Sequence, residues 1–257
     1  MSVKFDSSSS KATLIGGLED DETLEFQHVA TTMGEDLCGL VAVQVTSGVN
    51  LTGANLAATW GDEAMSLVSS GMVRYDSNEC FIALYSILNP PTGPKDIEIE
   101  IASVPNELAG RGFMACAATY TGVASVGAAV TKAAGGFTTT PFLTINGVAE
   151  AYRTVVAFGV DGLFFGDIKA TNANKRAQAI SVSTGELWLV DAEGSPNQVV
   201  TATINNSDHW AVAGVVLSPS VVTAEASQTI TAVTDGRAGL SREAPPHKSR
   251  YYLVPPA

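Results

Sequence analysis

The sequence predicts an all-β protein: an antiparallel β-sandwich followed by an extended C-terminal arm. Of the 257 residues, 46% are apolar and only 16% are charged, so the chain can bury a substantial core. Short strand-like runs recur along the chain, and turn-forming residues separate them. Long helical patterns are lacking.

The strand-like runs follow one another at short intervals. They cover residues 23–30, 37–46, 57–60, 65–68, 80–87, 96–103, 113–121, 142–145, 152–159, 176–182, 186–191, 198–204 and 209–217. Residues 96–101, DIEIEI, alternate apolar and acidic side chains, as a half-buried antiparallel strand requires. Residues 122–136 are rich in glycine, so we expect a loop that crosses between sheets.

We find no tandem repeat of fixed period, and neither half of the chain offers enough strands for a sandwich of its own. One sandwich domain is therefore expected over residues 20–219. An N-terminal segment (residues 1–19) would precede it, either as an ordered arm or as a further strand of the sandwich. The extended arm (residues 220–257) would follow it.

Composition excludes several classes of protein. A net charge of −12 argues against nucleic-acid binding. No window approaches the roughly 18–20 apolar residues that span a bilayer, so we expect no membrane insertion. The start of the chain lacks the apolar core of a secretory signal, which favours synthesis in a cytoplasm. Cys38, Cys80 and Cys116 are odd in number and widely spaced within apolar runs, so we expect buried free thiols.

The sequence offers no catalytic or metal-binding motif. His28, His209 and His247 are not paired in spacing, whereas a zinc site needs three or four converging ligands. Neither a Gly-x-Ser-x-Gly turn nor a phosphate-binding glycine loop occurs. We therefore expect a protein without enzymatic activity, metal or cofactor.

The tryptophans give the second functional hypothesis. Trp188 and Trp210 lie in predicted strands and are expected in the core. Trp60 lies at the end of a predicted strand, beside Asp62 and Glu63, so two interpretations stay open. It either belongs to the core or forms, with Asp62 and Glu63, the sugar-stacking site of a carbohydrate-binding module for a cell-wall glycan.

The C-terminal arm differs from the rest of the chain in charge. Residues 237–257 carry four basic side chains and one acidic side chain, a net of +3; with −12 overall, residues 1–236 carry −15. A basic, proline-rich and aromatic segment on an acidic protein favours docking to a partner, and another copy of the chain is an obvious candidate. The alternative is a disordered terminus. The residues expected to bind the partner are Arg237, Arg242, Lys248, Arg250, Tyr251 and Tyr252.

Three segments together resemble a known domain. Residues 59–68 (TWGDEAMSLV), 83–93 (ALYSILNPPTG) and 207–217 (SDHWAVAGVVL) are similar, in this order, to segments of a recurrent bacterial and phage β-sandwich. That domain occurs in bacterial surface proteins and in minor tail or decoration proteins of phages that infect actinobacteria. The resemblance implies a jelly-roll or concanavalin-like sandwich.

The resemblance also implies a function. It suggests a non-enzymatic structural protein of a tailed-phage virion, a minor tail or tail-tip protein, with capsid decoration as the alternative. Its partners would be other virion proteins or copies of itself in a homo-oligomeric assembly.

Overall fold

A computed structural model of the chain describes residues 2–15, 22–32, 36–47, 50–102, 111–134, 136–161, 168–181 and 184–220. These residues belong to one compact unit, Met1–Val222. The described part is all-β and its sheets are antiparallel, which confirms the predicted all-β sandwich. The expected C-terminal arm lies outside the described residues from position 221 onward. The strands are β1 (Lys4–Ile15), β2 (Glu22–Ala30), β3 (Cys38–Thr46), β4 (Asn55–Trp60), β5 (Glu63–Ala64), β6 (Ser66–Tyr75), β7 (Cys80–Leu88), β8 (Gly93–Ala102), β9 (Arg111–Thr121), β10 (Val123–Val126), β11 (Val130–Ala133), β12 (Phe142–Asn146), β13 (Arg153–Asp161), β14 (Ile168–Thr171), β15 (Asn174–Ser181), β16 (Gly185–Glu193), β17 (Asn197–Ile204) and β18 (His209–Pro219).

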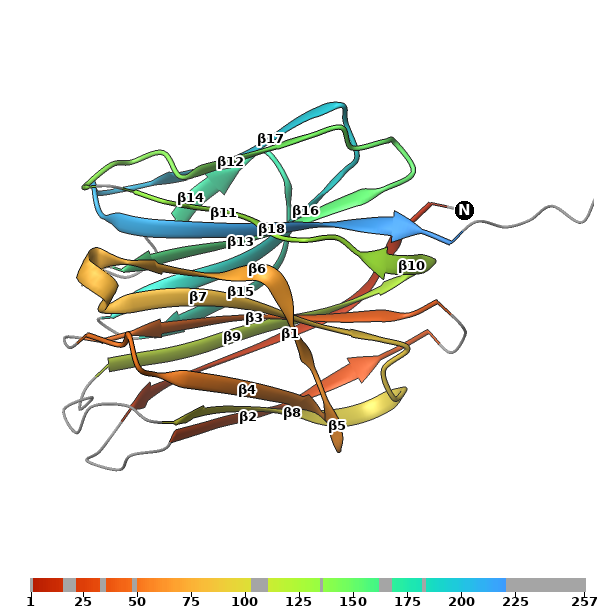
Figure 1. Cartoon of the computed structure of the whole chain (residues 1–257), viewed down its shortest axis with the longest axis horizontal. Coiled ribbons are helices and arrows are strands. Elements are labelled where there is room, and N and C mark those ends of the chain that lie inside the picture. The colour runs from red at the N-terminus through yellow and green to blue at the C-terminus, as the bar shows by residue number, and fades with distance from the viewer. Residues whose placement is uncertain are drawn as a thin grey trace, which may run out of the picture. The chain divides into compact units, whose positions relative to one another are not determined.

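The strands form four sheets that stack as layers (Figure 1). The first inner sheet has the strand order β1-β9-β3-β7-β6, and the first outer sheet that covers it has the order β2-β8-β4-β5. The second inner sheet has the order β10-β18-β13-β16-β15, with β11 also paired to β18. The second outer sheet has the order β12-β17-β14. One core lies between the two inner sheets, and one lies under each outer sheet.

The two halves of the chain repeat the same jelly-roll topology. In the first repeat (β1–β9), β1 pairs with the last strand, β9. β2 pairs with β8, and β3 pairs again with β9. In the second repeat (β10–β18), β10 and β11 both pair with the last strand, β18. β12 pairs with β17, and β13 pairs again with β18. This interleaving is the jelly-roll arrangement. The expectation that neither half has enough strands for a sandwich is therefore wrong.

Differences in burial explain why some strands are mostly apolar in sequence and others alternate apolar and polar residues. Central inner strands are covered on both faces, so all nine residues of β3 are buried, and only Gln44 and Thr46 interrupt its apolar sequence. Outer strands are covered on one face, so buried and exposed residues alternate along β2 and β8. The alternating run at residues 96–101 thus identifies an outer strand.

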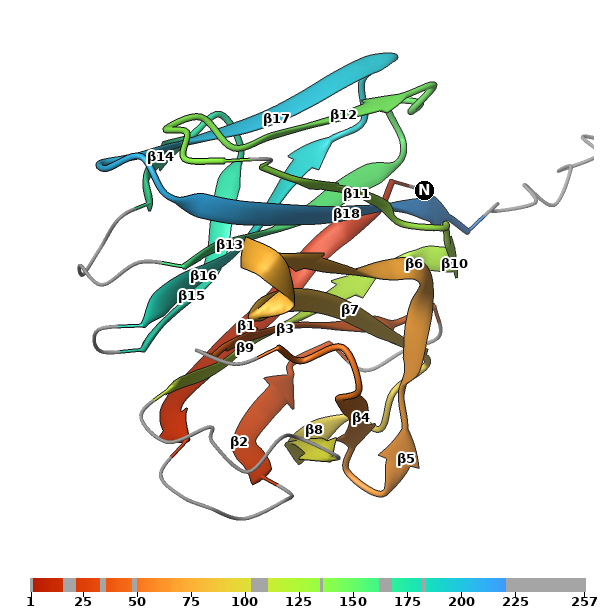
Figure 2. The same cartoon turned by 60° about the vertical axis from the view of Figure 1, so that its left-hand side comes forward.

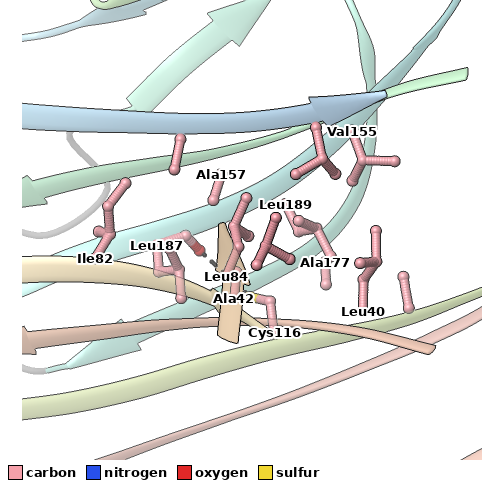
Figure 3. Close-up of a cluster of buried hydrophobic side chains, with 14 of the residues drawn as sticks. Leu40, Ala42, Ile82, Leu84, Cys116, Val155, Ala157, Ala177, Leu187 and Leu189 are labelled. Atoms are coloured by element: carbon pink, nitrogen blue, oxygen red, sulfur yellow. Dashed lines mark hydrogen bonds between the residues drawn. The ribbon is translucent and has the colours of Figure 1, made fainter. Parts of the chain in front are cut away.

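The inner sheets pack face to face through small and branched apolar side chains. Figure 3 shows this core, with Leu40, Ala42 and Leu84 from the first inner sheet facing Ala157 and Leu189 from the second. The strands contact one another reciprocally: β9 packs on β15 and β16, and its counterpart β18 packs on β6 and β7. Such exchanged contacts are those of a two-fold interface, here formed within one chain.

The N-terminal strand ties three sheets together. β1 pairs with β9, and its serines alternate in direction, as strand geometry requires. Ser7 and Ser9 bond the ring nitrogens of His28 on β2 at 3.2 and 2.8 Å. Ser8 and Ser10 donate to the carbonyl oxygens of Arg176 and Gln178 on β15 at 2.6 and 2.7 Å. Residues 4–15 thus form a strand of the sandwich, one of the two alternatives that the sequence left open for the N-terminal segment.

A buried ion cluster lies near the start of β1. The carboxylate of Asp191, 0% exposed, accepts from Arg153 at 2.9 Å and from Arg176 at 2.7 and 3.0 Å. The Arg153 side chain also donates to the carbonyl oxygen of Val3 at 3.3 Å, and the Arg176 guanidinium lies 4.1 Å from the centre of the Phe5 ring. The cluster therefore joins β1 to the second repeat.

Most of the predicted elements are present. Each of the thirteen predicted runs overlaps a strand, and Cys38, Cys80 and Cys116 are buried free thiols as expected. Residues 122–136 differ, because β10 and β11 lie there and pair with β18 where a loop was expected. Gly122, with φ of 71°, forms the turn that links the two repeats.

Replacing Asp191 with alanine should destabilise the fold, because two guanidinium groups would lose their shared carboxylate in a buried position. We expect a loss of about 3–5 kcal/mol in the free energy of unfolding, measured by urea denaturation. Glu193→Gln is the control, since Glu193 is 84% exposed and lies 3.8 Å from Arg153. Its loss should stay below about 1 kcal/mol. Equal losses in the two variants would contradict the role of the buried cluster.

Candidate functional site

The outer face of the first outer sheet is strongly acidic. Lys95 is the cation on this sheet, and in the described part of the chain no ion pair joins a lysine or arginine to these carboxylates. The carboxylates are Glu22, Glu25, Asp62, Glu63, Asp96, Glu98 and Glu100, and all but the half-buried Glu22 are exposed. We call this set the acidic face.

Like charges on the acidic face lie directly opposite each other. Glu25 on β2 is paired in register with Glu98 on β8. Such a pair destabilises a sheet, so packing alone gives no reason for it. At the corresponding strands of the second repeat, Thr144 on β12 faces Val199 on β17. The two repeats share a topology, but the acidic face belongs to the first.

An apolar groove lies beside the acidic face, between β4 and β6. β5 pairs only with Thr59 and Trp60, so among the described strands none pairs with the preceding part of the β4 edge. Figure 2 follows the chain from β5 into β6, where it leaves the outer sheet for the inner one. The groove has a volume of about 490 Å³, and Leu56, Leu67 and Met72 contribute to its lining. An exposed edge with an apolar floor suits an added extended segment.

The proposed glycan-binding residues divide between core and surface. Asp62 and Glu63 are exposed and belong to the acidic face. Trp60 is 0% exposed, and its indole packs edge-on against the His28 ring with centroids 4.9 Å apart. The strand register of β4 with β8 turns Trp60 inward beside Ile97. A fully buried indole has no face for a sugar, so the sugar-stacking interpretation of Trp60 is wrong.

The predicted core tryptophans lie in the described part of the chain, whereas the predicted partner-binding residues do not. Trp188 and Trp210 are buried in the core under the second outer sheet, as predicted. The residues predicted to bind a partner, Arg237, Arg242, Lys248, Arg250, Tyr251 and Tyr252, lie outside the described residues. Their role stays a prediction.

A serine, a histidine and an aspartate meet between β1 and β2. His28 bonds to Ser7 and Ser9, and Asp6 lies 3.4 Å from the Ser7 hydroxyl. In a hydrolytic triad the acid holds the far nitrogen of the imidazole, but here Ser9 occupies that position. His28 is also only 1% exposed. This arrangement joins strands and does not form a nucleophilic centre.

Burial shifts the ionisation of this network. Burial lowers the pKa of His28 to about 4, although the nearby Asp6 carboxylate opposes that shift. Hydrogen bonds from Thr31, Thr32 and Thr119 lower the pKa of Asp6 to about 2, against the opposing effect of its burial. At neutral pH the pair is therefore a neutral imidazole beside a carboxylate.

A second polar cluster was missed by sequence reasoning. Asp76 follows β6, Cys80 begins β7 and Asp161 ends β13, and their ligand atoms all lie within 4.8 Å of one another. No spacing rule could have found it, because the residues come from both repeats. Only the strand pairings bring them together.

Comparison of the chain with protein-family models, curated proteins and solved structures gives no match. The described residues contain no helix long and apolar enough to cross a membrane. The resemblance to phage tail and decoration proteins therefore stays a prediction that depends on the sequence segments alone.

The buried His28 should make stability depend on pH between about 6.5 and 4. In this window the unfolded chain binds a proton that the folded protein excludes, so stability falls as the pH falls. From pH 7 to 4.5 the wild type should lose about 2 kcal/mol more than His28→Gln in urea denaturation. The comparison between the two proteins cancels the contributions of other groups. An identical pH dependence in both would contradict the prediction.

Proposed function

We propose that this protein is a non-enzymatic structural protein of a tailed-phage particle, a minor tail or tail-tip protein. It docks to neighbouring copies through its C-terminal segment, residues 237–257. The surface that receives this segment is the acidic face of the first repeat and the adjacent groove.

The separation of charge along the chain carries the proposal. Residues 237–257 have a net charge of +3, while residues 1–236 have −15. The acidic face concentrates carboxylates on the exposed side of one outer sheet, including the opposed pair Glu25 and Glu98. A basic segment would relieve the repulsion on this face, and opposite charges would also speed association.

The groove supplies the second half of the recognition. Its apolar lining and the open edge of β4 accept an extended segment, which could hydrogen-bond to the edge backbone. Residues 250–256, RYYLVPP, combine a charge, two aromatic rings and two prolines. Tyrosine and arginine are frequent anchors of protein interfaces.

The fold agrees with a structural role by analogy. Jelly rolls are common in viral capsid proteins and lectins, and a shared fold does not itself establish function. The resemblance of residues 59–68, 83–93 and 207–217 to phage domains points to the same class. Capsid decoration is the alternative position in the particle.

Removing the positive charge of the tail should abolish self-association. In the full chain, Arg242, Lys248 and Arg250 are replaced together by glutamine, and association is measured by sedimentation velocity. We expect wild-type oligomers that weaken as salt rises, because exposed charges are screened, and a monomeric variant. A variant that associates like the wild type would contradict the role of the tail.

Matched substitutions locate the receiving surface. Glu98→Gln with Glu100→Gln removes two charges from the acidic face and should weaken association as the tail variant does. Glu150→Gln with Glu193→Gln removes two exposed charges from the second repeat and should leave association unchanged. If the tail variant loses self-association and the acidic-face variant does not, the tail docks on another surface.

The place in the particle has a direct test. Mass spectrometry of purified particles of a phage that carries this gene should detect the protein. Antibody labelling in electron microscopy should mark the tail, whereas labelling over the capsid would support decoration. Absence of the protein from the particles would contradict the proposal.

A further inference from the structure

The polar cluster of Asp76, Cys80 and Asp161 lies where the two repeats meet. Asp76 belongs to a left-handed turn, Asp76–Asn78, between β6 and β7 of the first repeat. Asp161 is the last residue of β13 in the second repeat and pairs in register with His209 on β18. Nδ1 of His209 lies 3.1 Å from a carboxylate oxygen of Asp76. Strands from both halves therefore converge on one small volume.

The donor atoms suit a transition metal. A thiol and two carboxylates have their ligand atoms within 4.8 Å of one another. Zinc binds thiolate and carboxylate at about 2.0–2.3 Å, which places ligand atoms on a shared ion roughly 3.3–3.8 Å apart. No pair of ligand atoms would therefore have to approach by more than about 1–1.5 Å to share one ion. Calcium and magnesium prefer oxygen ligands alone, so the thiol selects against them.

The cluster concentrates acidic groups without a strong cation. Cys80 is buried, and the two carboxylates beside it are half-buried. In the described ranges, the only basic group in an ion pair with this cluster is His209. A bound divalent ion would stabilise the deprotonated thiol and carboxylates together.

We propose that Asp76, Cys80 and Asp161 bind a divalent transition-metal ion of the zinc class at the junction of the two repeats. His209 orients the Asp76 carboxylate, as outer hydrogen-bond partners of metal ligands do. Cys80 is fully buried, while Asp76 and His209 are 24% and 22% exposed at the side chain, so the ion enters from their side. This proposal is independent of the proposed function.

The metal would act as a clamp between the repeats. Its ligands come from the turn before β7 and from β7 itself in the first repeat, and from β13 in the second. Because the ion binds only the folded arrangement, it should raise the temperature of unfolding. The clamp would add a fixed connection to a junction that is also joined by packing, by the contact of His209 with Asp76 and by the hydrogen bond from Gln44 to Val160.

The test uses the full chain after treatment with a chelator. Titration with Zn²⁺ by calorimetry should show one site per chain and an increase in melting temperature. Titration with Co²⁺ should give the thiolate charge-transfer absorption in the near ultraviolet, which reports the Cys80 ligand directly. Asp76→Asn and Cys80→Ser should each weaken Zn²⁺ binding at least tenfold, and Cys80→Ser should lose the Co²⁺ absorption band.

Cys116→Ser is the matched control, because Cys116 is an equally buried thiol in the core between the inner sheets. It should keep both the affinity and the absorption band. The Asp76→Asn variant changes a partly exposed side chain, so we expect it to fold. It therefore still tests the proposal if the Cys80→Ser variant does not fold. A wild type without a Zn²⁺ site would overturn the proposal. So would equal affinity in the wild type and the Asp76 and Cys80 variants.

Discussion

The packing of the two inner sheets against each other is the constraint on which the rest of the structure depends. It buries one face of each inner sheet, and the outer sheets cover the other, so central strands such as β3 are buried on both faces. Where the backbones approach, these strands carry small residues. Gly159 shows how closely the sheets approach, because a Cβ at this position would lie only 2.5 Å from Ile82 of the facing sheet. At the same place Gln44 crosses the junction and donates to the carbonyl oxygen of Val160 at 2.9 Å.

The inner faces are buried within the chain, so a partner would have to contact the outer faces, the sheet edges or the segments beyond the sandwich. Here the two repeats diverge. The second outer sheet presents Thr144 and Val199 where the first presents an opposed pair of glutamates. Like charges directly opposite each other destabilise a sheet, so the stability of the fold does not account for this pair. The difference between the repeats is therefore more informative about function than their shared topology.

The sequence predicted the class of fold well because burial on one or two faces leaves different patterns, as in residues 96–101 and 209–217. It did not predict β1, because the serines of this strand give no apolar pattern. In the structure their hydroxyls form hydrogen bonds to His28 and to β15. The duplication was missed because strand order repeats and residue identity does not. The position of Trp60 depends on strand register, and the cluster at Asp76 depends on pairings between the repeats.

The duplication also constrains how copies can assemble. In a chain whose two-fold interface is already closed internally, another symmetric contact through the inner sheets is not available. The proposed docking of the tail on the acidic face of the next copy would be a contact between different surfaces. Contacts of this kind produce rings when the rotation between copies closes and helical arrays when it does not. In the proposed assembly, the asymmetry between the two outer faces would give the contact its direction, because only the first repeat carries the acidic face.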